Sequence, residues 1–185
     1  MKNSLLSRYQ IRQRRKKTPE IHLELSAESE HELNAVLTEH IDDFSFWTAQ
    51  MYNEVWPEWV AHRTLQVSVR TVTPNRMAEI NGEYRGLNEP TDVLTFPLYE
   101  NNGAFMPEPS PIPLLLGDIV LCPEQIALNA ELHHVEGLSE LALVLFHGML
   151  HLLAWDHDTP DKQGRMWRVQ ERFRDHFLRG RVLKG

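Results

Sequence analysis

Alternating apolar and polar residues mark the strands of this chain. Alternation at Ile21, Leu23 and Leu25 predicts a first strand at about 19–26, and the same pattern around 65–69 predicts a second. Apolar positions within 93–96 predict a third strand. The run 114–121 is apolar apart from Gly117 and Asp118, which is typical of a largely buried fourth strand.

Apolar residues spaced three or four apart predict the helices. Ser29 and Glu32 have the form of a capping box ahead of the first. The others are predicted over about 43–55, from Thr73 and Pro74 towards Gly82, from Pro123 to near 137, from a cap at 139, and from 160 to a stop at 180. Residues 85–90 and 98–113 read as loops, and the second is a surface loop or a lid.

Strands mixed with helices without a regular strand–helix–strand rhythm indicate an α+β fold. We expect a small mixed β-sheet of about four strands packed with helices. A length of 185 residues suits one domain, which we place at 19–185 after a basic, flexible extension at 1–18.

Charge is distributed unevenly along the chain. Residues 1–17 hold seven of the 19 Lys and Arg residues and no acid, so the remainder carries 12 cations against 26 acids, a formal charge of −14. Because residues 18–185 are so acidic, a polyanion must bind at a local cationic site or at the basic tail. That tail is a disordered extension, an RNA tether or a targeting segment.

The cysteine content and the hydropathy of the chain indicate where in the cell the protein is found. Cys122 is the only cysteine, so the chain has no intramolecular disulfide, which fits a reducing cytoplasm. No stretch has the roughly 20 apolar residues of a membrane span. We therefore expect a cytoplasmic protein without a membrane partner.

The stretch 141–157, LALVLFHGMLHLLAWDH, carries the candidate chemistry. His147 and His151 lie one helical turn apart on the same face, and a turn must return His157 towards them. Burying imidazoles without partners costs a few kcal/mol each, roughly, and a metal supplies the partner. The pattern predicts a three-histidine site, zinc by default with nickel or cobalt as substitutes, and an open fourth position for water.

The same histidine spacing occurs in the zinc-protease motif HExxH, and His157 falls where metzincins place a third histidine. The metal helix is therefore zincin-like or metzincin-like. In those proteases a Glu after the first histidine activates the metal-bound water. Gly148 occupies that place and has no side chain, which argues against a peptidase.

Three stretches closely resemble the signatures of the YbeY family of bacterial rRNA maturation factors and endoribonucleases. HGMLHLLAWDH at 147–157 is similar to the family's HGxLHLxGYDH, the segment 84–97 to YRxxDxPTDVLSFP, and 116–120 to LGDIVI. The chain departs from the family at three positions: Ala154 and Trp155 replace Gly-Tyr, Asn88 replaces Asp, and Thr95 replaces Ser. If the helix ends in a left-handed residue at 154, alanine adds about 1 kcal/mol of strain.

The resemblance implies a zinc-dependent, single-strand-specific endoribonuclease that matures the 3′ end of small-subunit rRNA and acts in ribosome quality control. Its metal ligands are His147, His151 and His157, and Arg85 in the loop before the third strand stabilises the phosphate. His147 is also expected to be catalytic. Asp118 is one candidate for the general base and Asp156 another, although Asp156 fits better as a partner that orients a ligand histidine.

The resemblance also implies partners: single-stranded RNA or rRNA, the small ribosomal subunit, and assembly factors such as the Era GTPase. No DNA partner is expected. The alternative is a ribosome-assembly factor whose metal is mainly structural.

Overall fold

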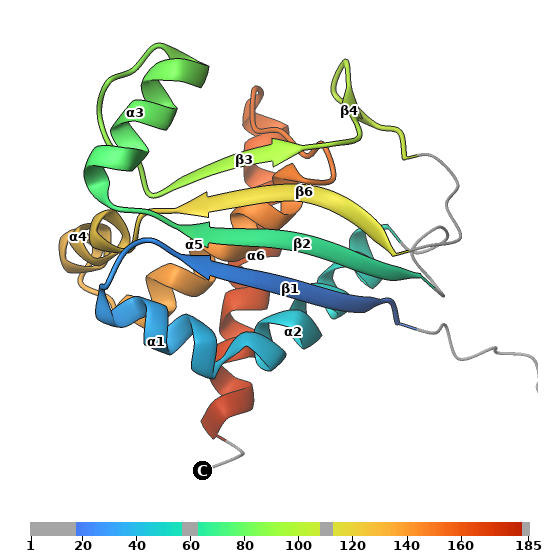
Figure 1. The fold of residues 1–185 in the computed structure, drawn as a ribbon. Helices are drawn as coiled ribbons and strands as arrows, with labels where there is room; N and C mark the ends of the chain where they lie inside the picture. Colours follow the sequence, from blue (N-terminus) through green and yellow to red (C-terminus); the bar gives the residue numbers. More distant parts are fainter. Residues whose placement is uncertain (1–17, 57–62, 108–112, 183–185) are drawn as a thin grey trace, which may run out of the picture.

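The computed structural model describes residues 18–56, 63–107 and 113–182. These residues form a mixed four-stranded sheet, a two-stranded hairpin and six helices (Figure 1). The main sheet has the order β1 (Glu20–Ala27), β2 (Thr64–Thr71), β6 (Leu114–Leu121), β3 (Val93–Pro97). The predicted α+β fold with about four strands is confirmed, whereas residues 1–17 of the predicted basic extension lie outside the described residues.

The strands β1, β2 and β6 run parallel, and β3 pairs with β6 in the opposite direction. The helices are α1 (Glu32–Glu39), α2 (Ile41–Val55), α3 (Pro74–Arg85), α4 (Pro123–His133), α5 (Gly137–His151) and α6 (Pro160–Val182). Figure 1 shows α2, α5 and α6 behind the sheet, where the alternate residues Leu65, Val67 and Val69 of β2 are fully buried. None of the described helices is long and apolar enough to cross a membrane.

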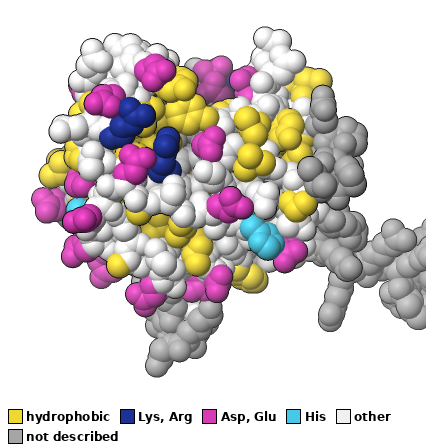
Figure 2. Space-filling view, in the orientation of Figure 1, with side chains coloured by type: hydrophobic (Ala, Val, Ile, Leu, Met, Phe, Trp, Pro, Cys, Tyr) yellow, Lys and Arg dark blue, Asp and Glu magenta, His cyan; other side chains and the backbone are white. Residues whose placement is uncertain are grey.

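The opposite face of the sheet is covered only in part. Helix α3 packs there through a second, smaller core that includes Met77, Ile80, Leu94 and Val120. Figure 2 shows acidic side chains scattered among hydrophobic areas on the side facing the viewer, with Lys and Arg confined to one small area.

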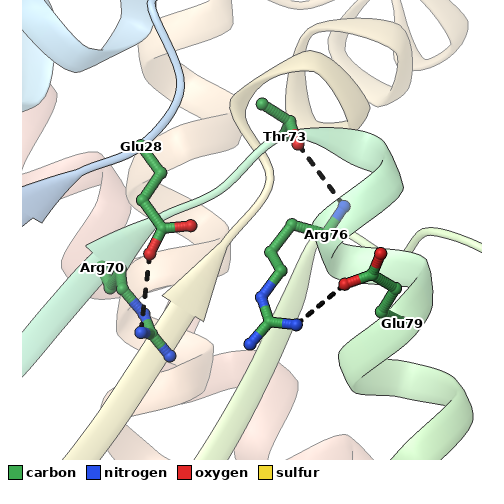
Figure 3. Close-up of polar contacts among 5 residues, drawn as sticks. All are labelled: Glu28, Arg70, Thr73, Arg76 and Glu79. Carbon is green, nitrogen blue, oxygen red and sulfur yellow. Dashed lines mark hydrogen bonds and ion pairs between the residues drawn. The ribbon is translucent and has the colours of Figure 1, made fainter.

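Two arginines on that side are already paired with carboxylates. Arg70 lies 3.6 Å from Glu28, and Arg76 lies 2.8 Å from Glu79 (Figure 3). A polyanion gains binding energy from cations that are free to neutralise its charges, so this face attracts polyanions weakly.

Helix α5 is the central element of the fold. It packs against α4 and α6 on one side and against β3 and β6 on the other. A Cβ at Gly148 would lie 3.2 Å from Cγ2 of Thr95 and 3.3 Å from Cδ1 of Ile119, so glycine allows the close approach of helix and sheet. The buried Tyr52 hydroxyl donates to the carbonyl of Met149 at 2.8 Å and ties α2 to α5. These contacts fix the position of α5, which carries His147 and His151, relative to the sheet and to α2.

Two predicted helix starts were wrong. Ser29 and Glu32 do not form a capping box, because the N-cap of α1 is His31, whose Nδ1 accepts from the backbone N–H of Leu33. Ser29 instead donates to Glu124 at the start of α4. Helix α5 begins at Gly137 and not after a cap at 139.

Other boundaries also differ from the prediction. Helix α2 begins at Ile41, and α6 continues past Gly180 to Val182. The predicted loop at 98–113 contains the hairpin β4 (Glu100–Asn101) and β5 (Ala104–Phe105), while 108–112 lie outside the described residues. Asn102 and Gly103 between these strands both have positive φ, as a two-residue type I′ turn requires.

Candidate metal centre

Three histidines meet beyond the C-terminal half of α5. His147 and His151 project from successive turns of the helix, and their Nε2 atoms lie 3.0 Å apart. His157 returns towards them after the turn that follows the helix. One ligand nitrogen from each ring lies within 4.8 Å of the other two. The predicted convergence of 147, 151 and 157 is therefore present in the structure.

The turn that returns His157 depends on a Schellman motif. The N–H of Trp155 donates to the carbonyl of Leu150 at 3.2 Å, and the N–H of Ala154 donates to the carbonyl of His151 at 2.9 Å. Ala154 occupies the left-handed position of this motif with φ +57°. The strained conformation considered from the sequence is thus the one that the backbone adopts.

Glycine at this position should stabilise the fold. We expect Ala154→Gly to raise the free energy of unfolding by about 1 kcal/mol, because glycine avoids the Cβ contact of the left-handed region. Urea unfolding of the metal-free protein measures the change. As a matched control, Ala35→Gly in the exposed interior of α1 should lower stability by about 1 kcal/mol. Loss of stability in both variants would contradict a strained Ala154.

The surroundings keep the two helical histidines neutral. Burial lowers the pKa of His151 to about 4, helped by the charges of His147 and His157. Burial also lowers the pKa of His147, although a hydrogen bond to Gln170 acts in the opposite direction. Metal ligation requires the neutral imidazole, so protons compete weakly with a metal at neutral pH.

A glutamine of α6, not anticipated from the sequence, orients His147. The Nδ1–H of His147 donates to Oε1 of Gln170 at 2.9 Å, and Gln170 is only 3% exposed. With Nδ1 used in this way, Nε2 is the atom left for a metal. The available sequence signal was a polar residue beside the apolar stripe of the last helix, at Met166, Val169 and Phe173.

Asp156 stabilises the turn after α5 and makes no hydrogen bond to a histidine ring among the described residues. Its Oδ1 accepts from the backbone N–H of His157 at 2.7 Å. Its charge nevertheless acts to raise the pKa of His151. Asp156 therefore places His157 through the backbone, whereas the orienting role expected of it for a ligand ring belongs to Gln170 at His147.

Arg85 lies at the C-terminal end of α3, the helix that packs on the opposite face of the sheet from α5. It is the last residue of α3 and not part of a loop as predicted, because Gly86, with φ +73°, takes the left-handed position after the helix. Its side chain is exposed, and its positive charge contributes to the lowered pKa of His147. This charge is a minor influence on the pKa of His147, after burial and the charge of His157.

Asp118 does not join the cluster. Its neighbour Ile119 contacts Gly148 of α5, and successive residues of a strand point to opposite faces. Asp118 is paired in register with Phe96, which packs on the α3 side of the sheet, and it is exposed. The expectation of a largely buried acid is corrected, and its carboxylate is not placed to act as a base at the histidines.

The donor set suits a transition metal of tetrahedral preference. A zinc ion bonded to two nitrogens at about 2.0–2.1 Å separates them by roughly 3.3 Å, close to the 3.0 Å between Nε2 of His147 and Nε2 of His151. The cluster offers three imidazole nitrogens, and the ring of His157 is exposed to solvent. The residues thus define an α+β protein with a three-histidine cluster of the kind that can hold a metal ion.

Comparison with known proteins identifies the family. A family model described as endoribonuclease YbeY matches residues 26–178, so the chain belongs to the YbeY family. The endoribonucleases YbeY of Mycobacterium sp. strain KMS and of Mycobacterium tuberculosis strain H37Rv are each 37% identical over 118 residues, which are 63% of this chain and 67% of theirs. The solution structure of TM1509 from Thermotoga maritima has a TM-score of 0.59 at 22% identity, covering 88% of this chain and 93% of that one, and it shares the fold.

Proposed function

We propose that this protein is a metal-dependent endoribonuclease specific for single-stranded RNA, acting in 3′-end maturation of small-subunit rRNA and in ribosome quality control. The observation that carries the proposal is the meeting of three imidazole nitrogens within 4.8 Å, under the field of Arg85, in a chain of the YbeY family. The related mycobacterial proteins are endoribonucleases by name.

The metal that we propose is zinc, held by His147, His151 and His157 on a zincin-like helix, with nickel or cobalt as substitutes. When bound, zinc lowers the pKa of a coordinated water to about 7, which makes hydroxide available at neutral pH. Burial keeps the two helical ligands, His147 and His151, neutral, and the hydrogen bond from His147 to Gln170 leaves Nε2 of His147 as the atom that would hold the ion.

Arg85 is the group that we assign to the phosphate. Cleavage of a phosphodiester builds negative charge on the phosphoryl oxygens, and a guanidinium donates two hydrogen bonds to such oxygens with matching geometry. No ion pair of Arg85 is seen among the described residues, so its donors are available to a substrate. This favours phosphodiester over peptide substrates, as does Gly148, which has no side chain to activate a metal-bound water.

The proposal extends to location and partners. We place the protein in the cytoplasm, with rRNA as substrate and the small ribosomal subunit and assembly factors such as the Era GTPase as partners. We also propose that 19–185 is the catalytic domain and that it follows a basic extension at 1–18. The acidic and paired surface in Figures 2 and 3 directs RNA away from the open sheet face.

Cleavage assays on matched RNAs test the activity. We expect the purified full chain to cut an unstructured RNA oligonucleotide, to lose activity after chelation of its metal, and to regain it when zinc is added. The same strand annealed to its complement should be cut at least tenfold more slowly, since the bases are then stacked and paired. Equal cleavage of both forms, or full activity after chelation, would contradict the proposal.

A further inference from the structure

Two cavities open directly beside the histidine cluster. The first has a volume of about 210 Å³, and the residues lining it that matter here are Asp92, His133, Glu140, His147, Trp167 and Gln170. The second, also about 210 Å³, is lined by His147, His157, Gln163, Met166, Trp167 and Gln170. Drug-sized ligands occupy pockets of roughly 300–1,000 Å³. The first, which we call the Asp92 cavity, is therefore of a size for one small planar group next to the metal centre.

An aromatic side chain stands at the junction of the two cavities. Trp167 is 51% exposed, and no ring contact or cation–π contact involves it among the described residues. An indole this exposed contributes little to the hydrophobic core, so packing does not explain a tryptophan at this position. Exposed aromatic rings beside a nuclease centre are platforms on which an unpaired base can stack.

The floor of the Asp92 cavity carries hydrogen-bond acceptors. Glu140 is 5% exposed, and its Oε1 accepts from Nδ1–H of His133 at 3.2 Å. Asp92 is held by Nδ2 of Asn129 at 3.2 Å and by the N–H of Val93 at 2.8 Å. Two fixed carboxylates thus line a cavity that has no Lys or Arg in its described lining. Such a cavity repels a phosphate and accepts N–H groups.

The side-chain amide of Gln170 adds a hydrogen-bond donor to the two carboxylates of the Asp92 cavity. Oε1 of Gln170 is used by His147, so its side-chain NH₂ is the group left over, and it has no hydrogen-bond partner among the described residues. This nearly buried amide lines the same cavity. A donor beside two acceptors matches the Watson–Crick edge of guanine, which presents the O6 acceptor next to the N1–H and N2–H donors. Uracil presents two carbonyl acceptors around a single N–H and is a poor match.

We propose that the Asp92 cavity binds an unpaired guanine base, stacked on Trp167, with the carboxylates accepting from N1–H and N2–H and Gln170 donating to O6. The base site is inferred from this cavity alone, but its use on RNA next to the cleaved bond rests on the proposed function. The cavity adjoins His147, so a bound guanine places a neighbouring phosphodiester near the metal centre and Arg85.

Nucleotide titration tests the base site without turnover. The zinc-loaded full chain, labelled with ¹⁵N, is titrated with guanosine, inosine and uridine 5′-monophosphates while the indole N–H signals are followed, and Trp167→Phe assigns the relevant signal. We expect guanosine monophosphate to bind about tenfold more tightly than uridine monophosphate, with inosine monophosphate between them because it lacks N2–H. All three carry the same phosphate, so their ratio reports the base.

Variants locate the preference in the cavity. Trp167→Ala should weaken guanosine monophosphate binding about tenfold, and Trp167→Phe should retain most of it. Glu140→Gln should reduce the preference for guanosine over uridine monophosphate. Phe46→Ala, which removes a similarly exposed ring from α2 far from both cavities, is the matched control and should change nothing.

The outcomes separate this inference from the nuclease proposal. Equal binding of guanosine and uridine monophosphates, or an unchanged ratio in both Trp167→Ala and Glu140→Gln, overturns the guanine site even if the wild type cleaves RNA. A guanine preference lost in these variants supports the site even if no RNA is cleaved. With an active wild type, the same two variants should also lose preference for cleavage next to G in an otherwise U-rich oligonucleotide.

Discussion

His151→Ala should leave the protein folded but without its metal, and RNA cleavage should fall at least a hundredfold. Losing a mere supporting partner of a ligand costs about 10–100-fold in metal affinity, so losing a ligand costs more. Only two imidazoles would remain, one of them on the exposed turn at His157. Zinc content after dialysis, measured by mass spectrometry, and single-turnover cleavage of a labelled oligonucleotide give the two readouts.

A matched histidine serves as the control. His22 is exposed on β1 beside Glu20, on the open face of the sheet, and His22→Ala should keep both zinc and cleavage. If His151→Ala also keeps stoichiometric zinc and wild-type cleavage, the ion is bound elsewhere and the assignment of the cluster fails.

Arg85→Ala should separate metal binding from catalysis. We expect full zinc content and a fall in cleavage of about 10²–10³-fold, the usual cost of removing one group that stabilises a developing oxyanion. Arg85→Lys should recover only part of the rate, because an ammonium cannot donate two parallel hydrogen bonds to a phosphate. Both variants are measured under single-turnover conditions, which report the chemical step.

Helix α3 offers its own control for this variant. Arg76 lies in the first turn of the helix, paired with Glu79, and its backbone N–H is capped by Thr73 (Figure 3). Arg76→Ala removes a cation from the same helix at the far end from Arg85 and should leave cleavage within about twofold, as for other exposed ion pairs. An equal loss in both variants would show that Arg85 acts through general charge and not on the phosphate.

The elements with a clean hydrophobic period could be predicted from the sequence. Strand β2 alternates strictly between buried and half-exposed residues, and α2 keeps its apolar stripe through Phe44 and Met51. The histidine cluster was predictable for the same reason, since i and i+4 on any helix share a face. Even the strain at Ala154 followed from a local rule, because helix ends of this kind select a left-handed residue.

The remaining features depend on tertiary contacts or on local irregularity. A register shift between β2 and β6 interrupts the alternation near Gly117, so the apolar run around Asp118 concealed an exposed acid. The hairpin at Asn102 and Gly103 had a usable Asn-Gly signal, but its strands are only two residues long. Gln170 lies 23 residues from the ring it orients, which no local pattern reveals.

X-ray absorption at the zinc edge of the loaded protein distinguishes a metal ion held by three histidines with an open fourth position from one in a closed site. We expect one zinc per chain with three imidazole nitrogens at about 2.0–2.1 Å and one further light-atom ligand that azide displaces. A closed sphere of four protein ligands, unchanged by azide, would contradict it and would favour a structural metal in an assembly factor.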